Sequence, residues 1–149
     1  MSEHVAKLDW KRGEDDFAYK NYSRNHSWEF QNGDTLIASA APQYLGDPTK
    51  VDPEQAFVAS LASCHMLTFL AIASMQRKTV DAYQDKAIGR LAKNPQGKMV
   101  ISTVDLYPII KFAPGSEPTQ AELQAMHDKA HQECFLANSV TCEIVTHIQ

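Results

Sequence analysis

Two cysteines that lie far apart in this 149-residue chain carry the side chains best suited to redox chemistry. Cys64 lies within a long uncharged stretch, and Cys134 lies near the end of a second stretch with helical periodicity. A cysteine thiolate attacks a peroxide oxygen, and the sulfenic acid that forms condenses with a second thiol to a disulfide. We therefore interpret the pair as a peroxide-reducing dithiol, provided that the fold brings the thiols within disulfide distance. The alternative is that both are small apolar core residues, as free cysteines often are.

A thiol in an apolar helix needs a neighbouring positive charge, because burial alone raises the thiol pKa and disfavours the thiolate. Arg24 could supply that charge, and Glu54 could orient the guanidinium through a bidentate ion pair. Ten helical residues from Glu54 to Cys64 place their Cα atoms about 15 Å apart. We therefore predict two such helices packed antiparallel across a two-fold axis, with a site shared between subunits. Taken alone, an arginine and a glutamate at these positions are more often ordinary surface charges.

The stretch that holds Cys64 has the signals of a long, buried helix. Asp52 is placed to cap it, Pro53 suits its first position, and Gln55 completes a capping-box pattern with Asp52. No charged residue occurs in residues 56–76, so we expect the helix to be buried on nearly every side. A membrane-spanning helix is the competing interpretation. Serine, threonine and histidine within the run lower its hydropathy, and we favour a core helix that a homodimer covers.

The remaining segments predict a mixture of strands and helices. A first strand is expected at residues 5–10, and two more are expected within residues 24–39 around an Asn-Gly turn, with Arg24 opening the first of these two. Long strands are expected at 79–91 and 98–112. A helix at 119–135 with a Thr119–Glu122 capping box and a last strand at 141–148 complete the chain. Pro108 predicts an edge or a bend, and the basic residues at 76–78 are expected in the last turn of the long helix. This order predicts an α+β fold with antiparallel hairpins in a single domain, residues 1–149.

The overall composition excludes several classes of function. The net charge is -4, and the 14 basic residues are scattered along the chain, so we expect no nucleic-acid partner and no membrane partner. The first twelve residues are polar and contain no apolar core of a secretion signal. Three cysteines, an odd number, are more typical of a reducing compartment than of a disulfide scaffold. We therefore expect a cytoplasmic protein.

The second expected helix carries three side chains of a type that binds metals, and their spacing is compatible with a metal site. They are His127, His131 and Cys134. Asp128 stands where the zinc-protease helix needs a glutamate, and no further ligand motif follows. We favour a solvated or half-buried helix face there, and we predict no metal and no organic cofactor.

An apolar pocket for the organic group of a substrate is expected around the central helix. The residues that could line it are Tyr44, Phe57, Met66 and Phe69. Aromatic and methionine side chains at helical spacing are, however, more often simple core residues. His65 is interpreted as a helix histidine that could tune Cys64, and Cys142 is interpreted as a core residue of the last strand.

Three segments of the chain occur together in an order typical of a known family. Residues 51–64 begin Val-Asp-Pro-Glu-Gln-Ala-Phe and end on a cysteine ten residues after the glutamate. Residues 130–138 are Ala-His-Gln-Glu-Cys-Phe-Leu-Ala-Asn, and Arg24 lies nine residues before Gly33. These features resemble the Asn-Pro-Glu-Gln-Leu-Phe segment, the second cysteine motif and the arginine position of the organic hydroperoxide resistance and osmotically inducible protein (Ohr/OsmC) family, in an OsmC-like branch. Phe135 stands where many members have a proline.

The resemblance implies an Ohr/OsmC-like fold, in which antiparallel sheets wrap around long central helices in an intertwined homodimer. It implies thiol-dependent reduction of organic hydroperoxides to alcohols, with Cys64 as the peroxidatic thiol and Cys134 as the resolving thiol. Arg24 and Glu54 are then the activating pair. The resemblance also implies a dithiol reductant, such as one of the lipoyl type. The alternatives are a non-catalytic binder of hydrophobic small molecules on the same scaffold and, third, a metal-binding helix protein.

Overall fold

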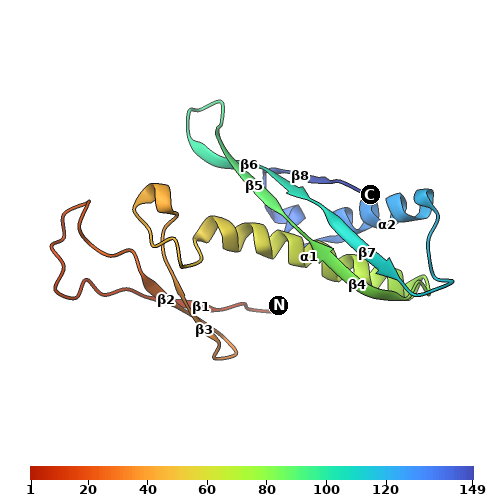
Figure 1. Cartoon of the computed structure of the whole chain (residues 1–149), viewed down its shortest axis with the longest axis horizontal. Coiled ribbons are helices and arrows are strands. Elements are labelled where there is room, and N and C mark those ends of the chain that lie inside the picture. The colour runs from red at the N-terminus through yellow and green to blue at the C-terminus, as the bar shows by residue number, and fades with distance from the viewer. The chain divides into compact units, whose positions relative to one another are not determined.

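The computed structural model describes all residues, 1–149, as two compact units, Met1–Ala56 and Phe57–Gln149. In chain order the elements are β1 (Ala6–Asp9), β2 (His26–Phe30), β3 (Thr35–Ala38), a 3₁₀ turn (Pro42–Tyr44), α1 (Pro53–Met75), β4 (Val80–Asp85), β5 (Ile88–Lys93), β6 (Met99–Leu106), β7 (Pro108–Phe112), α2 (Gln120–Glu133), a second 3₁₀ turn (Ala137–Ser139) and β8 (Glu143–Thr146) (Figure 1). Two helices and three sheets in this order confirm the α+β class. The single domain over the whole chain stays a prediction.

The first unit contains a three-stranded antiparallel sheet in the order β1-β2-β3. Trp28 in the middle strand pairs with Leu8 on one side and Leu36 on the other. The predicted hairpin turn is confirmed between β2 and β3, where Gly33 has a φ of 91°, a left-handed value that glycine adopts readily. Strand β2 begins at His26, so the prediction that Arg24 opens this strand is wrong by two residues.

Helix α1 begins as its sequence predicts. The backbone N–H of Gln55 donates to the Asp52 carboxylate at 2.8 Å, and the Asp52 N–H donates to the Gln55 side chain at 3.1 Å. This reciprocal pair is a capping box, and the helix starts at Pro53.

The end of α1 differs from the expectation that basic residues lie in its last turn. The helix ends at Met75, and Arg77 adopts a left-handed φ of 58°. The N–H of Lys78 then donates to the Ala73 carbonyl at 2.9 Å, which satisfies an otherwise free carbonyl at the helix end. The basic residues therefore follow the helix because the left-handed residue closes it first.

The burial of α1 in the single chain is one-sided, so its burial on nearly every side, which was expected to involve a homodimer, stays a prediction. Its buried residues form one stripe: Leu61, His65, Phe69, Ile72 and Ala73. Leu67 is 60% exposed and Met75 is 73% exposed. By length and composition α1 could cross a membrane, with a mean hydropathy of 1.9 over an 18-residue window, but core helices of soluble proteins pass the same test.

The second unit is built on one long hairpin whose two arms are each broken once. Each arm was predicted as a single strand, but the first arm divides into β4 and β5 and the second into β6 and β7. The arms pair antiparallel, β4 with β7 and β5 with β6. The second break falls at Tyr107, directly before Pro108, and β7 lies in a two-stranded sheet with β4, so the edge expected at Pro108 is present. The Tyr107 N–H donates to the Asp85 carboxylate at 2.7 Å instead of to a backbone carbonyl of a neighbouring strand.

The last strand adds a feature that the antiparallel expectation missed. Strand β8 pairs with β6 in parallel, with Val104 opposite Ile144. A parallel neighbour requires a crossover connection, and the chain between β7 and β8 provides one through α2. The sheet order is therefore β5-β6-β8.

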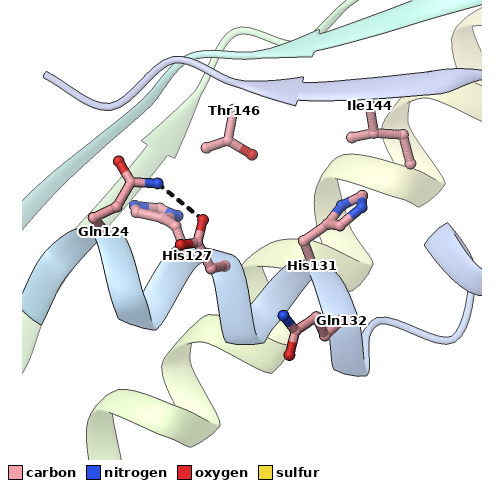
Figure 2. Close-up of a pocket in the computed structure, with 7 residues that line it drawn as sticks. Gln124, His127, His131, Gln132, Ile144 and Thr146 are labelled. Atoms are coloured by element: carbon pink, nitrogen blue, oxygen red, sulfur yellow. Dashed lines mark hydrogen bonds between the residues drawn. The ribbon is translucent and has the colours of Figure 1, made fainter.

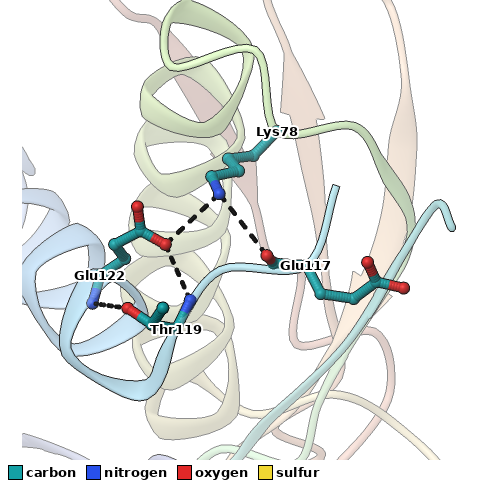
Figure 3. A network of polar contacts seen from close by, with 4 residues as sticks. All are labelled: Lys78, Glu117, Thr119 and Glu122. Atoms are coloured by element: carbon teal, nitrogen blue, oxygen red, sulfur yellow. Dashed lines mark hydrogen bonds and ion pairs between the residues drawn. The ribbon is translucent and has the colours of Figure 1, made fainter. Parts of the chain in front are cut away.

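Helix α2 has the predicted capping box, in which the Glu122 N–H donates to the Thr119 hydroxyl and the Thr119 N–H donates to the Glu122 carboxylate. The same carboxylate pairs with the Lys78 ammonium at 3.3 Å, and this ammonium also lies 3.5 Å from the Glu117 carbonyl oxygen (Figure 3). This network joins the start of α2 to the residues that follow α1. Helix α2 ends at Glu133, so the predicted end at residue 135 is two residues too long.

Two apolar clusters form the core of the second unit. The first joins α1 to α2 and consists of Phe69, Ile72, Ala73, Met126 and Ala130. The second joins α1 to β6 and consists of Leu61, Val104 and Leu106. Both helices are thus fixed along apolar stripes, with α1 common to the two clusters.

Candidate functional site

The two cysteines predicted to act together lie side by side in the second unit. Cys64 lies on α1 and is half-buried, whereas Cys134 directly follows α2 and is 1% exposed. Burial, and then hydrogen bonding with the Cys64 side chain, raise the pKa of the Cys134 thiol. All three cysteines are free thiols. The fold therefore places the side chains of Cys64 and Cys134 next to each other, with no disulfide formed.

Backbone contacts hold Cys134 in place after the helix. Its N–H donates to the Ala130 carbonyl at 3.0 Å, and its sulfur accepts the Ala137 N–H at 3.4 Å. The next side chain, Phe135, is 83% exposed, although Cys134 itself is covered. Cys64 is therefore the more accessible of the two thiols, and Cys134 is the one whose protonated form the surroundings favour.

The predicted activating residues, Arg24 and Glu54, both lie in the first unit. The Arg24 guanidinium stacks over the Tyr22 ring at 3.9 Å and lies 5.2 Å from the centre of the Tyr19 ring. It also donates to the backbone carbonyls of both tyrosines. Glu54 lies in the first turn of α1 and forms no ion pair with Arg24 within the chain. A Glu54 supplied by a second copy stays a prediction.

A buried pair of histidines, which sequence reasoning missed, lies between α1 and α2. His65 and His127 are each 2% exposed, and the Nε2 atom of His65 lies 3.0 Å from the Nδ1 atom of His127. The rings are nearly parallel, with an interplanar angle of 5°, and the Phe69 ring lies 4.4 Å from the His127 ring. The spacing of four residues between His65 and both Leu61 and Phe69 is the sequence signal that places His65 on the buried stripe.

Burial keeps both histidines of this pair neutral. It lowers the pKa of His65 to about 4, with smaller contributions in the same direction from His127 and His131. Burial also lowers the pKa of His127 to about 4, against a small opposing effect of Asp128. A neutral imidazole has one donor and one acceptor nitrogen, so the two rings can share one N–H···N hydrogen bond.

The neutral pair predicts loss of stability in acid. The pKa of each histidine in the folded chain, about 4, lies below the ordinary value of 6.5, so the unfolded chain binds more protons between these limits. Full stability is therefore expected above pH 6.5, with progressive loss as the pH falls toward 4, on the order of 3 kcal/mol for one histidine. Urea unfolding at several pH values between 7 and 4 measures this loss.

A variant with both rings replaced, His65→Leu with His127→Phe, provides the control for the acid effect. Its free energy of unfolding is expected to depend less on pH above 4.5, because the groups that must be protonated are absent. Equal pH slopes in the variant and the natural chain would assign the acid effect to other groups.

The predicted metal-ligand residues on α2 are engaged in separate contacts. His127 bonds His65, Cys134 contacts Cys64, and His131 is exposed. No group of three or more His, Cys, Asp or Glu side chains in the chain could hold a metal ion. The metal-binding alternative therefore has no ligand set in the structure.

A small cavity of about 290 Å³ lies between α2 and β8 (Figure 2). It is lined by Gln124, His127, Asp128, His131, Gln132, Ile144 and Thr146. The lining is mainly polar, and it includes the exposed His131 and one edge of the buried His127.

The residues expected to line an apolar substrate pocket are distributed over both units. Tyr44 is exposed in the 3₁₀ turn of the first unit, and Met66 is half-buried on α1. Phe57 packs against the Leu61 cluster. Phe69 is completely buried, so in this structure it packs as a core residue rather than lining an open pocket. Cys142 is half-buried and packs against the Leu61 cluster, which agrees with its interpretation as a core residue.

A cluster of polar side chains, which lies away from the cysteines, connects the segment around β8 to the neighbouring strands. The buried Asp105 carboxylate forms an ion pair with Arg90 and a hydrogen bond, at 2.7 Å, with Nε2 of His147. The Tyr107 ring stacks on the His147 ring at 4.4 Å. These contacts fasten the C-terminal segment to β5 and β6, and they involve no residue near the thiols.

Comparison with known proteins shows similarity over the whole chain. Residues 46–149 match the family described as OsmC-like protein, and no curated protein matches the chain. An OsmC-like protein of unknown function from Vibrio cholerae is 47% identical, with a TM-score of 0.93 and 100% of each chain covered. An organic hydroperoxide resistance protein OsmC from Legionella pneumophila is 21% identical, with a TM-score of 0.71 over 99% of this chain and 98% of that chain. The organic hydroperoxide resistance protein OhrB of Bacillus subtilis is 16% identical, with a TM-score of 0.69 and the same coverage of 99% and 98%.

Proposed function

Because this chain belongs to the OsmC-like protein family, we propose that it reduces organic hydroperoxides to alcohols with the thiols of Cys64 and Cys134. The observation that carries the proposal is the contact between the two thiols, which lie 70 residues apart in the sequence. Two proteins of similar fold are described as organic hydroperoxide resistance proteins, which supports the same substrate class.

The proposed reaction has two steps on the chain and one with an external reductant. The Cys64 thiolate attacks the peroxide oxygen, the O–O bond breaks, and the departing alkoxide takes a proton to give the alcohol. The Cys134 thiol then attacks the Cys64 sulfenic acid, an S–S bond forms, and water leaves. A dithiol, such as one of the lipoyl type, supplies two electrons and two protons to restore both thiols.

The unequal surroundings of the thiols support this division of roles. Cys64 is half-buried, so a hydroperoxide can approach it more readily than Cys134. The raised pKa of Cys134 keeps its thiol protonated and able to donate a hydrogen bond to the Cys64 sulfur.

We further propose that Arg24 and Glu54 complete the site in a cytoplasmic homodimer. A guanidinium beside Cys64 would stabilise the thiolate, and Glu54 of a second copy would orient it. The exposed apolar side chains of α1, including Leu67 and Met75, support burial against a second copy. No metal or organic cofactor has a role in this scheme.

Peroxide oxidation followed by mass spectrometry tests the proposed function. One equivalent of cumene hydroperoxide should remove two hydrogen atoms from the reduced protein, and peptide mapping should find a disulfide between Cys64 and Cys134. Cys142 should remain a thiol, and a Cys142→Ser variant should react in the same way. A chain that keeps all its thiols in excess hydroperoxide would instead favour the non-catalytic binder. A persistent sulfenic acid would remove Cys134 from the resolving role.

A further inference from the structure

We propose that the buried hydrogen bond between His65 and His127 positions Cys64 against Cys134 for disulfide formation. This inference rests on the proposed function, because it assigns the pair to the second step of that reaction. The two histidines are positioning residues: neither needs to touch the hydroperoxide.

The location of the pair in the helix interface is the first argument. One end of the interface is tied by the Lys78–Glu122 ion pair at 3.3 Å (Figure 3), and the thiols meet at the other end. This order makes α1 and α2 antiparallel neighbours. The hydrogen bond between His65 and His127, at 3.0 Å, lies between the two ends. His65 directly follows Cys64, so a shift of the pair along α2 moves the Cys64 sulfur away from its partner.

The second argument is that the apolar contacts between the helices are not directional. Phe69, Ile72 and Ala73 of α1 pack on Met126 and Ala130 of α2, and all five are apolar. Apolar packing tolerates small sliding and rotation at little cost in contact area, whereas an N–H···N bond requires a narrow range of distance and angle. The histidine pair is therefore the polar contact that selects one register of α1 on α2 near the thiols.

The third argument is that both rings are almost completely covered. Each ring is 2% exposed, and Phe69 covers His127 at 4.4 Å. Rotation of either ring would leave a buried nitrogen without a partner, which carries the full cost of desolvation. Helix α1 carries no charge from residue 56 to 76, and of the neighbours on α2 only Asp128 and His131 are titratable near the pair. The bond is thus a neutral one with a fixed geometry.

Redox equilibrium with glutathione tests the inference without any peroxide. The experiment uses a Cys142→Ser background and buffers with known ratios of reduced to oxidised glutathione. The fraction of protein that carries the Cys64–Cys134 disulfide then gives the effective concentration of the Cys64 thiol relative to the Cys134 thiol. We expect His127→Phe, which keeps an aromatic ring on Phe69 but removes the hydrogen bond, to lower this effective concentration about tenfold or more. His127→Asn, whose amide can occupy the place of Nδ1, should restore it to within about twofold.

Matched variants separate positioning from simple loss of stability. His131→Asn changes an exposed histidine one turn further along α2 and should leave the equilibrium unchanged. If His127→Phe does not fold, His65→Leu with His127→Phe removes both polar partners together and is expected to fold. This double variant should show the same lowered effective concentration.

Two outcomes would overturn the inference. One is a wild-type glutathione equilibrium in a folded His127→Phe or double variant. The other is an equally lowered effective concentration in His127→Asn and His127→Phe, because the conservative change would then give no rescue. A natural chain that forms the disulfide with glutathione but not with cumene hydroperoxide would contradict the proposed function and leave the positioning role supported.

Discussion

Replacing Cys64 with serine is expected to abolish the reduction of organic hydroperoxides, with a fall in rate of at least about a thousandfold because a hydroxyl group forms no sulfenic acid. The substitution removes a single sulfur from a half-buried position on α1, and serine is nearly the same size. The fold should therefore persist. The loss of cumene hydroperoxide, with dihydrolipoamide as electron donor, measures the rate.

Serine at the other two cysteines gives the controls for this result. Cys134→Ser should still consume one equivalent of hydroperoxide and stop at a sulfenic acid on Cys64, because its resolving partner is gone. Cys142→Ser should behave as the natural chain, since Cys142 contacts core residues and neither of the other thiols. Full activity of Cys64→Ser would remove Cys64 from the site and end the proposed mechanism.

Replacing Arg24 with methionine is expected to slow the oxidation of Cys64 by about a hundredfold, the scale of losing one charged stabiliser of a developing anion. The guanidinium is proposed to favour the Cys64 thiolate and to balance the charge on the departing alkoxide. Methionine keeps a long side chain without the charge. Stopped-flow oxidation over a range of pH should show a slower maximum rate and a thiolate that forms at higher pH.

Two further arginine variants make the Arg24 result specific. Arg24→Lys keeps the positive charge but loses the planar guanidinium group with its paired N–H donors, so a rate of Cys64 oxidation between those of the natural chain and Arg24→Met is expected. Arg12→Met removes another arginine of the first unit, one that donates only to the Asp15 carbonyl, and should react at the natural rate. Because Arg24 also stacks on Tyr22, thermal unfolding of each variant should accompany the rates. An unchanged rate in folded Arg24→Met would exclude Arg24 from the reaction.

The sequence by itself determined the features that depend on residues a few positions apart. The Asp52–Gln55 and Thr119–Glu122 capping boxes set the starts of the two helices, and both are present as predicted. Gly33 likewise allows the hairpin turn between β2 and β3. Such signals are reliable because every atom that forms them lies within one turn of chain.

The family, too, was apparent from the order of three motifs, and the match over residues 46–149 confirms it together with the expected fold. The roles proposed for Cys64, Cys134, Arg24 and Glu54 rest on the same motifs and stay predictions. The structure adds the contact between the two thiols to this prediction. The homodimer, its substrate and its reductant stay predictions.

Only the tertiary structure decided which residues meet across long stretches of chain. Periodicity could not show that each long arm of the hairpin breaks in the middle, because the breaks at residues 86–87 and at Tyr107 depend on pairing between strands. It also could not show that β8 joins β6 in parallel, which depends on the path of α2.

The two histidines show the same limit most directly. Histidine is moderately polar, so its burial follows from a partner that can accept or donate its hydrogen bond, and that partner is 62 residues away. The sequence placed His65 one residue from Cys64 and His127 seven residues before Cys134. It was the packing of α1 on α2 that made them a pair, because a hydrogen bond between helices exists only once both helices are in position.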